Sequence, residues 1–259
     1  MERRKLLGLF GLTAASAAFG LGNSSLRKAV ASEGGSSWGY VGSGAPENWG
    51  QRSSAYRVCK TGLQQSPIDL HNAIGANLEN IKIDYQPVPL SILNDGYTIQ
   101  VNTAGENTIK LDGEVFELLQ FHFHYPSEHT LDGKPYPMEV HFVHANTKGE
   151  LAVLGVFFKE GTENAALAPV WQAIPAQKTE PKEIADVMVD IAELLPSDHN
   201  MYRYFGSLTT PPCSEIVKWV VFQKPITIST AQIAQFKKIL PPSARPVQPL
   251  ERRFVLQSN

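Results

Sequence analysis

The sequence predicts a mainly β protein that forms a single domain with a few short helices. Short segments of apolar or alternating pattern recur along the chain, and turn-forming residues separate them. A helical period is clear at one place and weaker at another. The chain has 259 residues, of which 42% are hydrophobic and 19% charged. This composition supplies enough apolar material for a core and excludes a disordered chain.

The expected elements follow one another with turns between them. Segments that fit strands are, in order, 81–85, 90–93, 98–101, 108–111, 117–125, 138–145, 151–158 and 216–222. Asn94-Asp95-Gly96, Asp112-Gly113 and Asp132-Gly133 are turn signals. Residues 231–240 predict a helix with Thr230 as its cap, and residues 164–174 fit a weaker one. Residues 183–195 fit either type of element.

The first 31 residues predict a cleaved export signal. Arg3, Arg4 and Lys5 form a basic start, residues 6–22 are uncharged, and Ala29-Val30-Ala31 matches a cleavage site. The uncharged run is shorter than the ~20 apolar residues that span a bilayer, so a membrane anchor is the weaker alternative. The paired arginines resemble a twin-arginine signal, but the general secretory route stays open. We expect residues 32–259 to form one exported domain, periplasmic or extracellular, without stable membrane insertion.

Charge and cysteine content limit the partners of that domain. Removal of residues 1–31 leaves 18 Lys and Arg against 24 Asp and Glu, a net charge of −6. The sequence has no cluster of Lys and Arg that could neutralise phosphates, which argues against nucleic acid as a partner. Cys59 and Cys213 form an even pair in an exported chain, which favours a disulfide over two buried free thiols. The sequence does not indicate an oligomeric state.

The strongest chemical signal is a strand that carries two histidines. In residues 120–125, polar and bulky apolar residues alternate, so a strand would turn Gln120, His122 and His124 to one face. Phe121 and Phe123 would then be buried on the other face. Two imidazoles pointing the same way are typical of metal ligands.

A third histidine lies on the next predicted strand. Residues 126–137 connect the two strands, and Glu139, His141 and Val143 share a face of the second. Antiparallel pairing would bring His141 to the first two histidines. Three neutral nitrogens suit Zn²⁺ with a fourth position open to water, which is the arrangement of a catalytic site. Gln120 and Glu139, each two residues before a predicted ligand, could orient ring N–H groups.

The remaining histidines are interpreted as structural residues that hydrogen-bond within the fold. They are His71, His129, His144 and His199.

Taken together, several motifs resemble the α-class carbonic anhydrases, in that family's order. They are Trp38-Gly39-Tyr40, Gln65-Ser66-Pro67-Ile68, Leu93-Asn94-Asp95-Gly96, the segment 120–124, Ser127-Glu128-His129-Thr130, the segment 139–144, the segment 151–155 and Gly206-Ser207-Leu208-Thr209-Thr210-Pro211-Pro212. The resemblance runs from Trp38 to Arg253 and is nearest to the secreted bacterial and plant-type branch.

The resemblance implies a central, mostly antiparallel ten-stranded sheet and the reaction CO₂ + H₂O ⇌ HCO₃⁻ + H⁺, in which zinc-bound hydroxide attacks CO₂. It implies that Thr209 donates its proton to Glu128 and that Thr210 helps to hold bicarbonate. The implied hydrophobic wall for CO₂ consists of Val143, Val153, Leu208 and Trp219. Secreted members carry cysteines at the places of Cys59 and Cys213, and Arg245 matches a structural cation.

The proton path departs from the fastest members of the family. Tyr97 stands where those enzymes place a histidine, and Tyr40 matches a tyrosine of the family's cavity. A phenol with a pKa near 10 is a poor proton shuttle at neutral pH. Turnover is therefore expected to depend on buffer.

Two other functions compete with this interpretation. His122-x-His124 followed by Glu128 also fits the first half of a cupin metal motif, in which Glu128 would be a ligand, but a second cupin motif is not apparent. A non-catalytic, carbonic-anhydrase-like binding protein is the other alternative. Such relatives often lose a zinc histidine, whereas this chain keeps all three.

Overall fold

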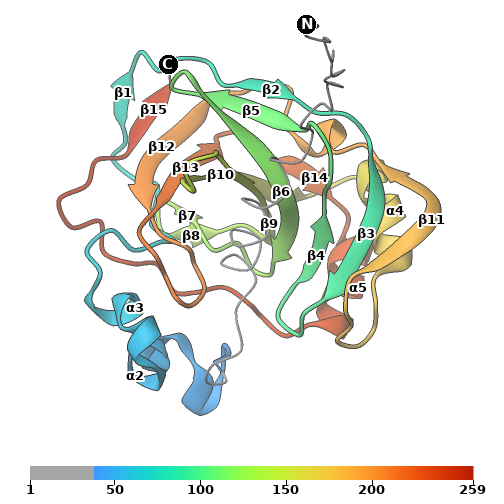
Figure 1. Cartoon of the computed structure of the whole chain (residues 1–259), viewed down its shortest axis with the longest axis horizontal. Coiled ribbons are helices and arrows are strands. Elements are labelled where there is room, and N and C mark those ends of the chain that lie inside the picture. Colours follow the sequence, from blue (N-terminus) through green and yellow to red (C-terminus); the bar gives the residue numbers. More distant parts are fainter. Residues whose placement is uncertain (1–37, 259) are drawn as a thin grey trace, which may run out of the picture. The chain divides into compact units, whose positions relative to one another are not determined.

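A large mixed sheet carries the fold (Figure 1), seen in a computed structural model that describes residues 38–258. Among these residues the sheet has thirteen strands. Ten of them follow one another as β1 (Ile74–Ala76), β15 (Leu256–Ser258), β12 (Met201–Gly206), β13 (Val217–Phe222), β10 (Leu151–Glu160), β9 (Met138–Ala145), β6 (Glu114–His124), β4 (Ile99–Asn102), β3 (Val88–Asn94) and β11 (Lys182–Val189). The predicted export signal, residues 1–31, lies outside the described residues.

Three further strands pair beside this path. Strand β14 (Ile226–Ile228) pairs with β10, while β5 (Thr108–Leu111) pairs with β6 and with β2 (Lys82–Asp84). A separate hairpin of β7 (Thr130–Leu131) and β8 (Lys134–Pro135) lies within the connection between β6 and β9. The expectation of a mostly antiparallel sheet needs one refinement, because β1–β15, β10–β13 and β10–β14 pair in parallel.

The helices are short. They are α2 (Trp49–Arg52), α3 (Val58–Thr61), α4 (Ala168–Ala173) and α5 (Thr230–Ile239), with 3₁₀ turns at Gly42–Gly44, Pro46–Asn48, Ser54–Tyr56, Ala165–Leu167 and Ala192–Leu194. The predicted cap of α5 was wrong by one residue. Ser229 caps the helix in a box with Gln232, since its hydroxyl accepts the Gln232 N–H. Within 38–258, no helix combines the length and the apolar character that crossing a membrane requires.

Central strands of the sheet present different chemistry on their two faces. One face packs into the main apolar core, which includes Phe121, Phe123, Phe142 and Leu154. On the other face, His122 pairs with His141 across β6 and β9, and Val143 pairs with Val153 across β9 and β10. Alternation along each strand therefore separates the core from the polar groups described below.

Candidate metal centre

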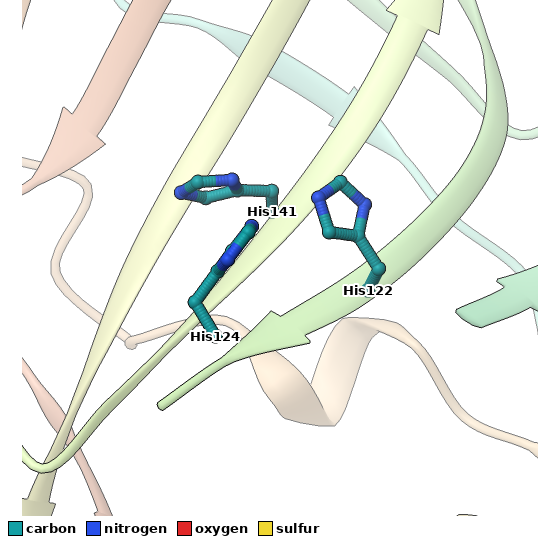
Figure 2. A group of neighbouring side chains, drawn as sticks. All are labelled: His122, His124 and His141. Carbon is teal, nitrogen blue, oxygen red and sulfur yellow. The ribbon is translucent and has the colours of Figure 1, made fainter. Parts of the chain in front are cut away.

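Three imidazoles converge on the polar face of the sheet (Figure 2). His122 and His124 project from β6, and His141 projects from the neighbouring strand β9. One ring nitrogen of each lies within 4.8 Å of those of the other two. His124 and His141 are buried, and His122 is half-buried. The structure thus brings together the two histidines that the alternating pattern placed on one face and the third that antiparallel pairing was expected to add.

The second ring nitrogen of each histidine faces a protein acceptor. His122 Nδ1 lies 2.8 Å from the amide oxygen of Gln120, and His124 Nδ1 lies 2.8 Å from the carbonyl oxygen of Ser243. Since both partners can only accept, Nδ1 carries the hydrogen and Nε2 keeps a free lone pair. The Gln120 contact agrees with the sequence prediction. The Ser243 contact was missed, because a backbone carbonyl leaves no signal in a side-chain pattern.

His141 is oriented by Glu139. Its Nε2 lies 2.9 Å from Glu139 Oε1, and although the N–H is not aligned for a regular hydrogen bond, this proximity turns Nδ1 toward the other histidines. Burial would raise the pKa of the Glu139 carboxyl, but the neighbouring His129 and His141 hold it well below its usual range. Glu139 is therefore an ionised acceptor at the back of the site.

Burial also favours the neutral form of two of these imidazoles, those of His122 and His141. It lowers the pKa of His122 well below its ordinary value, and the proximity of His124 and His141 lowers it further. Burial likewise lowers the pKa of His141, against the opposing effect of Glu139. Neutral imidazoles are the form that binds metal ions.

Several buried atoms around the centre have no hydrogen-bond partner within the described residues, among them His141 Nε2 and Ser243 Oγ. Two others, His124 Nε2 and Glu128 Oε2, face each other 3.5 Å apart. The other carboxylate oxygen of Glu128 accepts the backbone N–H of Arg245 at 2.9 Å. Unpaired buried polar atoms are costly, so their convergence indicates a site for a bound group.

A second cluster, His129 with Glu139 and His141, is also compact enough for a metal ion. However, both ring nitrogens of His129 already have hydrogen-bond partners within the protein. His129 Nδ1 lies 2.7 Å from Glu139 Oε1, and its Nε2 lies 2.7 Å from the Tyr204 hydroxyl. With both ring nitrogens bonded inside the protein, His129 has the structural role that the sequence predicted.

Apolar side chains adjoin His141 on the same face. Val153 pairs with Val143 on one side and with Trp219 on the other. The Trp219 ring meets the His141 ring edge-on, with 4.9 Å between centroids. All three apolar residues are buried, and Leu208 is half-buried just before Thr209 and Thr210.

A disulfide joins Cys59 in α3 to Cys213, which follows the Thr209-Thr210 segment. The N–H of Cys213 donates to the carbonyl of Thr210 at 2.9 Å. The Arg245 guanidinium donates to the Cys59 carbonyl, also at 2.9 Å. The predicted pairing is confirmed, and it fastens the threonine segment beside the centre. No hydrogen bond joins the Thr209 side chain to Glu128 in the described part of the chain.

Neither predicted tyrosine has an ordinary phenol environment. The Tyr97 ring stacks on Trp38, with centroids 4.4 Å apart, and its hydroxyl donates to the Trp38 carbonyl. Burial raises the pKa of Tyr97, and Asp95 raises it further. Burial raises the pKa of Tyr40 well above its usual value, with Glu128 and Asp95 acting in the same direction. Both phenols therefore stay protonated at neutral pH.

Comparisons with known proteins agree with this geometry. A family model for the eukaryotic-type carbonic anhydrases matches residues 44–259. A carbonic anhydrase of Nostoc sp. is 42% identical, and the match covers 100% of this chain and 98% of that protein. One from Pectobacterium carotovorum is 44% identical over 85% of this chain and 90% of that protein. The solved structure of α-carbonic anhydrase from Thermovibrio ammonificans with the inhibitor sulfanilamide has a TM-score of 0.83 and 46% identity, covering 86% of this chain and 100% of that chain.

Proposed function

The chain belongs to the eukaryotic-type carbonic anhydrase family, and we propose that it catalyses the reversible hydration of CO₂ to bicarbonate and a proton. CO₂ hydration is the activity of that family, which is zinc-dependent. Family membership over most of the chain removes the cupin alternative. The convergence of all three histidines favours an enzyme over a non-catalytic binding protein, because such relatives often lose a zinc histidine.

One observation carries the proposal: each of the three imidazoles has one nitrogen facing a protein acceptor and one nitrogen without a hydrogen bond to residues 38–258. The free atoms are Nε2 of His122, Nε2 of His124 and Nδ1 of His141. Three neutral nitrogen donors with room for a fourth ligand are the donor set of a catalytic zinc site. We therefore assign Zn²⁺ to these residues, with Gln120, Glu139 and the Ser243 carbonyl fixing the rings.

When bound, zinc lowers the pKa of a water molecule to about 7, which makes a nucleophile available at neutral pH. The side chains around the site then orient the reacting groups. The free oxygen of Glu128 is suited to accept the hydroxyl proton of Thr209, because Arg245 already holds the other oxygen. The Thr209 oxygen would then be an acceptor directed at the reacting group, with Thr210 beside it for bicarbonate.

The apolar wall gives CO₂ a place to bind. CO₂ has no net dipole, so it gains more from an apolar surface than from a polar one. Val143, Val153 and Trp219 occupy neighbouring strands in register beside His141, and Leu208 precedes the threonines. We assign these four residues to substrate binding.

Proton release is assigned to buffer rather than to a side-chain shuttle. The Tyr97 hydroxyl donates a hydrogen bond to the Trp38 carbonyl, and burial raises the pKa of both Tyr40 and Tyr97. Neither phenol therefore offers an acceptor near neutral pH, although both stand where the resemblance placed proton-path residues.

Export of the catalytic domain is part of the same proposal. We propose that residues 1–31 are removed and that residues 32–259 act in the periplasm or outside the cell. The disulfide between Cys59 and Cys213 supports an oxidising compartment.

Metal analysis combined with CO₂ hydration kinetics tests the function. Protein purified without chelators should contain about one zinc per chain, because the site provides one set of three donors. His122→Ala should lose both zinc and hydration, while His199→Ala, which changes an exposed imidazole, should keep both. Full hydration by His122→Ala at sub-stoichiometric metal would refute the assignment.

A further inference from the structure

We propose that Gly155 is a positioning residue whose missing side chain leaves the space in which Glu139 orients His141. Gly155 lies on β10, directly across from His141 on β9 and Val221 on β13. It occupies the polar face of the sheet, next to Val153 of the apolar wall. The inference deepens the proposed function, since it concerns how this chain shapes its zinc site.

A methyl group at position 155 would collide with the carboxylate. A Cβ built on Gly155 would lie 2.9 Å from Glu139 Oε1, closer than real Cβ atoms approach other atoms. On the other side, the methyl carbons of Val221 would lie 3.4 and 3.5 Å away, already in contact. The new methyl would therefore lie between Val221 and the carboxylate, and the carboxylate is the group that it would displace.

Glu139 cannot be displaced without losing its bonds. The side chain is fully buried. Oε2 accepts the backbone N–H of Glu128 at 2.9 Å and of His129 at 3.0 Å. Oε1 meets His129 Nδ1 at 2.7 Å and His141 Nε2 at 2.9 Å. Oε1 is the oxygen that the methyl would strike, so the displacement is transmitted to the ring of His141.

The consequence is a change in zinc affinity. His141 offers Nδ1 to the metal only while its Nε2–H faces Glu139. Disturbing an outer partner of a metal-bound histidine typically weakens metal binding by about 10- to 100-fold. We expect Gly155→Ala to fall in that range, although position 155 never touches the metal.

Zinc dissociation constants from competition with a chelator provide the main test. Gly155→Ala should bind zinc about 10- to 100-fold more weakly than wild type. Gly161→Ala is the matched control, because its Cβ would meet only the side chain of Thr227, at 3.1 Å, far along the same segment. The control should stay within about twofold of wild type, since it disturbs no partner of a ligand.

A second readout uses zinc-free protein. Nitrogen NMR of the His141 ring should show the Nε2–H tautomer in wild type and Gly161→Ala, and a mixture with the Nδ1–H tautomer in Gly155→Ala. This measurement tests the Gly155, Glu139 and His141 arrangement even if wild type proves not to bind zinc. Failure of wild type to bind zinc would refute the proposed function instead, so the two failures are distinguishable.

A Glu139→Asp background tests whether the clash is with Glu139. Aspartate is one methylene shorter and withdraws the carboxylate from position 155. Adding Gly155→Ala to that background should change zinc affinity by less than about twofold, since the pair then acts as one unit. Should Gly155→Ala fold only together with Glu139→Asp, the clash is likewise supported. The inference is overturned by wild-type affinity and tautomer in Gly155→Ala, by equal losses in both backgrounds, or by failure of both to fold.

Discussion

Strand β9 carries a histidine on each of its faces, and the two differ in what their nitrogens bond. His141 lies on the polar face, with Nε2 2.9 Å from Glu139 Oε1. Its Nδ1 lies 3.9 Å from Glu128 Oε2, beyond hydrogen-bond distance of that nearest carboxylate in residues 38–258. His144 lies on the core face, where Nδ1 donates to the Ala152 carbonyl at 3.1 Å and Nε2 accepts from the Tyr85 hydroxyl at 2.6 Å. Both are buried. A free nitrogen, rather than burial or residue type, therefore separates a candidate ligand from a structural histidine.

The same distinction holds for oxygens around the site. Glu139 is surrounded by donors, whereas Glu128 keeps one buried oxygen without a hydrogen-bond partner among the residues that the structure describes. The Tyr97 hydroxyl is engaged by the Trp38 carbonyl. Side chains that keep a polar atom without a hydrogen-bond partner can bind a metal ion or substrate. Side chains whose polar atoms are all hydrogen-bonded hold the site in place.

The largest effect is expected from Glu128→Gln. The amide oxygen can still accept the Arg245 N–H, but an NH₂ donor replaces the free oxygen that is proposed to accept the Thr209 proton. We expect kcat/KM for CO₂ hydration to fall by about 10- to 100-fold. Zinc content should stay near that of wild type, because the three histidines are unchanged.

Exposed Glu163→Gln is the control for this substitution and should leave both quantities unchanged. Loss of zinc from Glu128→Gln would contradict the distinction, because it would make Glu128 a metal ligand.

The sequence predicted which residues share a face of the sheet better than it predicted which atoms form hydrogen bonds. Strand β9 was predicted with its observed bounds, and the alternation of Phe121, His122 and Phe123 was confirmed. A period of two residues is a property of the strand itself, so it can be seen in the sequence. Strands β1, β12, β14 and β15 were missed, because three of them are only three residues long and β12 has an irregular burial pattern.

Contacts that depend on the assembled sheet could not be predicted. The Ser243 carbonyl reaches His124 across 119 residues of sequence, and a carbonyl is present at every position. Gly155 entered the sequence analysis only as part of an apolar strand and of the motif 151–155, and its proximity to Glu139 could not be predicted because it depends on the register of β9 with β10. Parallel pairing of β10 with β13 likewise required the structure, because the strands are separated by a long crossover.

The second prediction concerns His144 and stability in acid. Burial lowers the pKa of His144 from 6.5 to about 3 in the folded protein. Between these values the unfolded chain binds a proton that the folded chain does not, so stability is lost as pH falls. The loss from this residue should reach at most about 1.4 kcal/mol per pH unit. His144→Gln should be less stable at pH 7 and show a shallower decline.

Urea unfolding of zinc-free protein between pH 7 and pH 4 measures both slopes. His199→Gln, which removes an exposed imidazole, should decline as steeply as wild type. An unchanged slope in His144→Gln would mean that His144 takes up a proton in the folded state, and its two hydrogen bonds would then not define a structural histidine.

The smallest effect is expected from Tyr97→His, which replaces an engaged hydroxyl by a group that can accept a proton near neutral pH. Each hydration cycle releases one proton, which must reach solvent. Wild-type kcat should therefore rise with the concentration of an imidazole-type buffer, while kcat/KM, which reports the reaction with CO₂, stays nearly constant. At low buffer Tyr97→His should raise kcat by up to about tenfold, below the 10²–10⁴-fold of an ideally placed group. The gain is limited because the new ring can still stack on Trp38.

Tyr97→Phe separates the hydroxyl from the ring in the same assay. It keeps the aromatic stack on Trp38 and removes only the hydroxyl bond, so its buffer dependence should match that of wild type. A wild-type kcat that is already independent of buffer would show that another group in the fold exports the proton. Because kcat/KM and zinc content do not depend on that step, such a result would revise the proton path and leave the three-histidine centre in place.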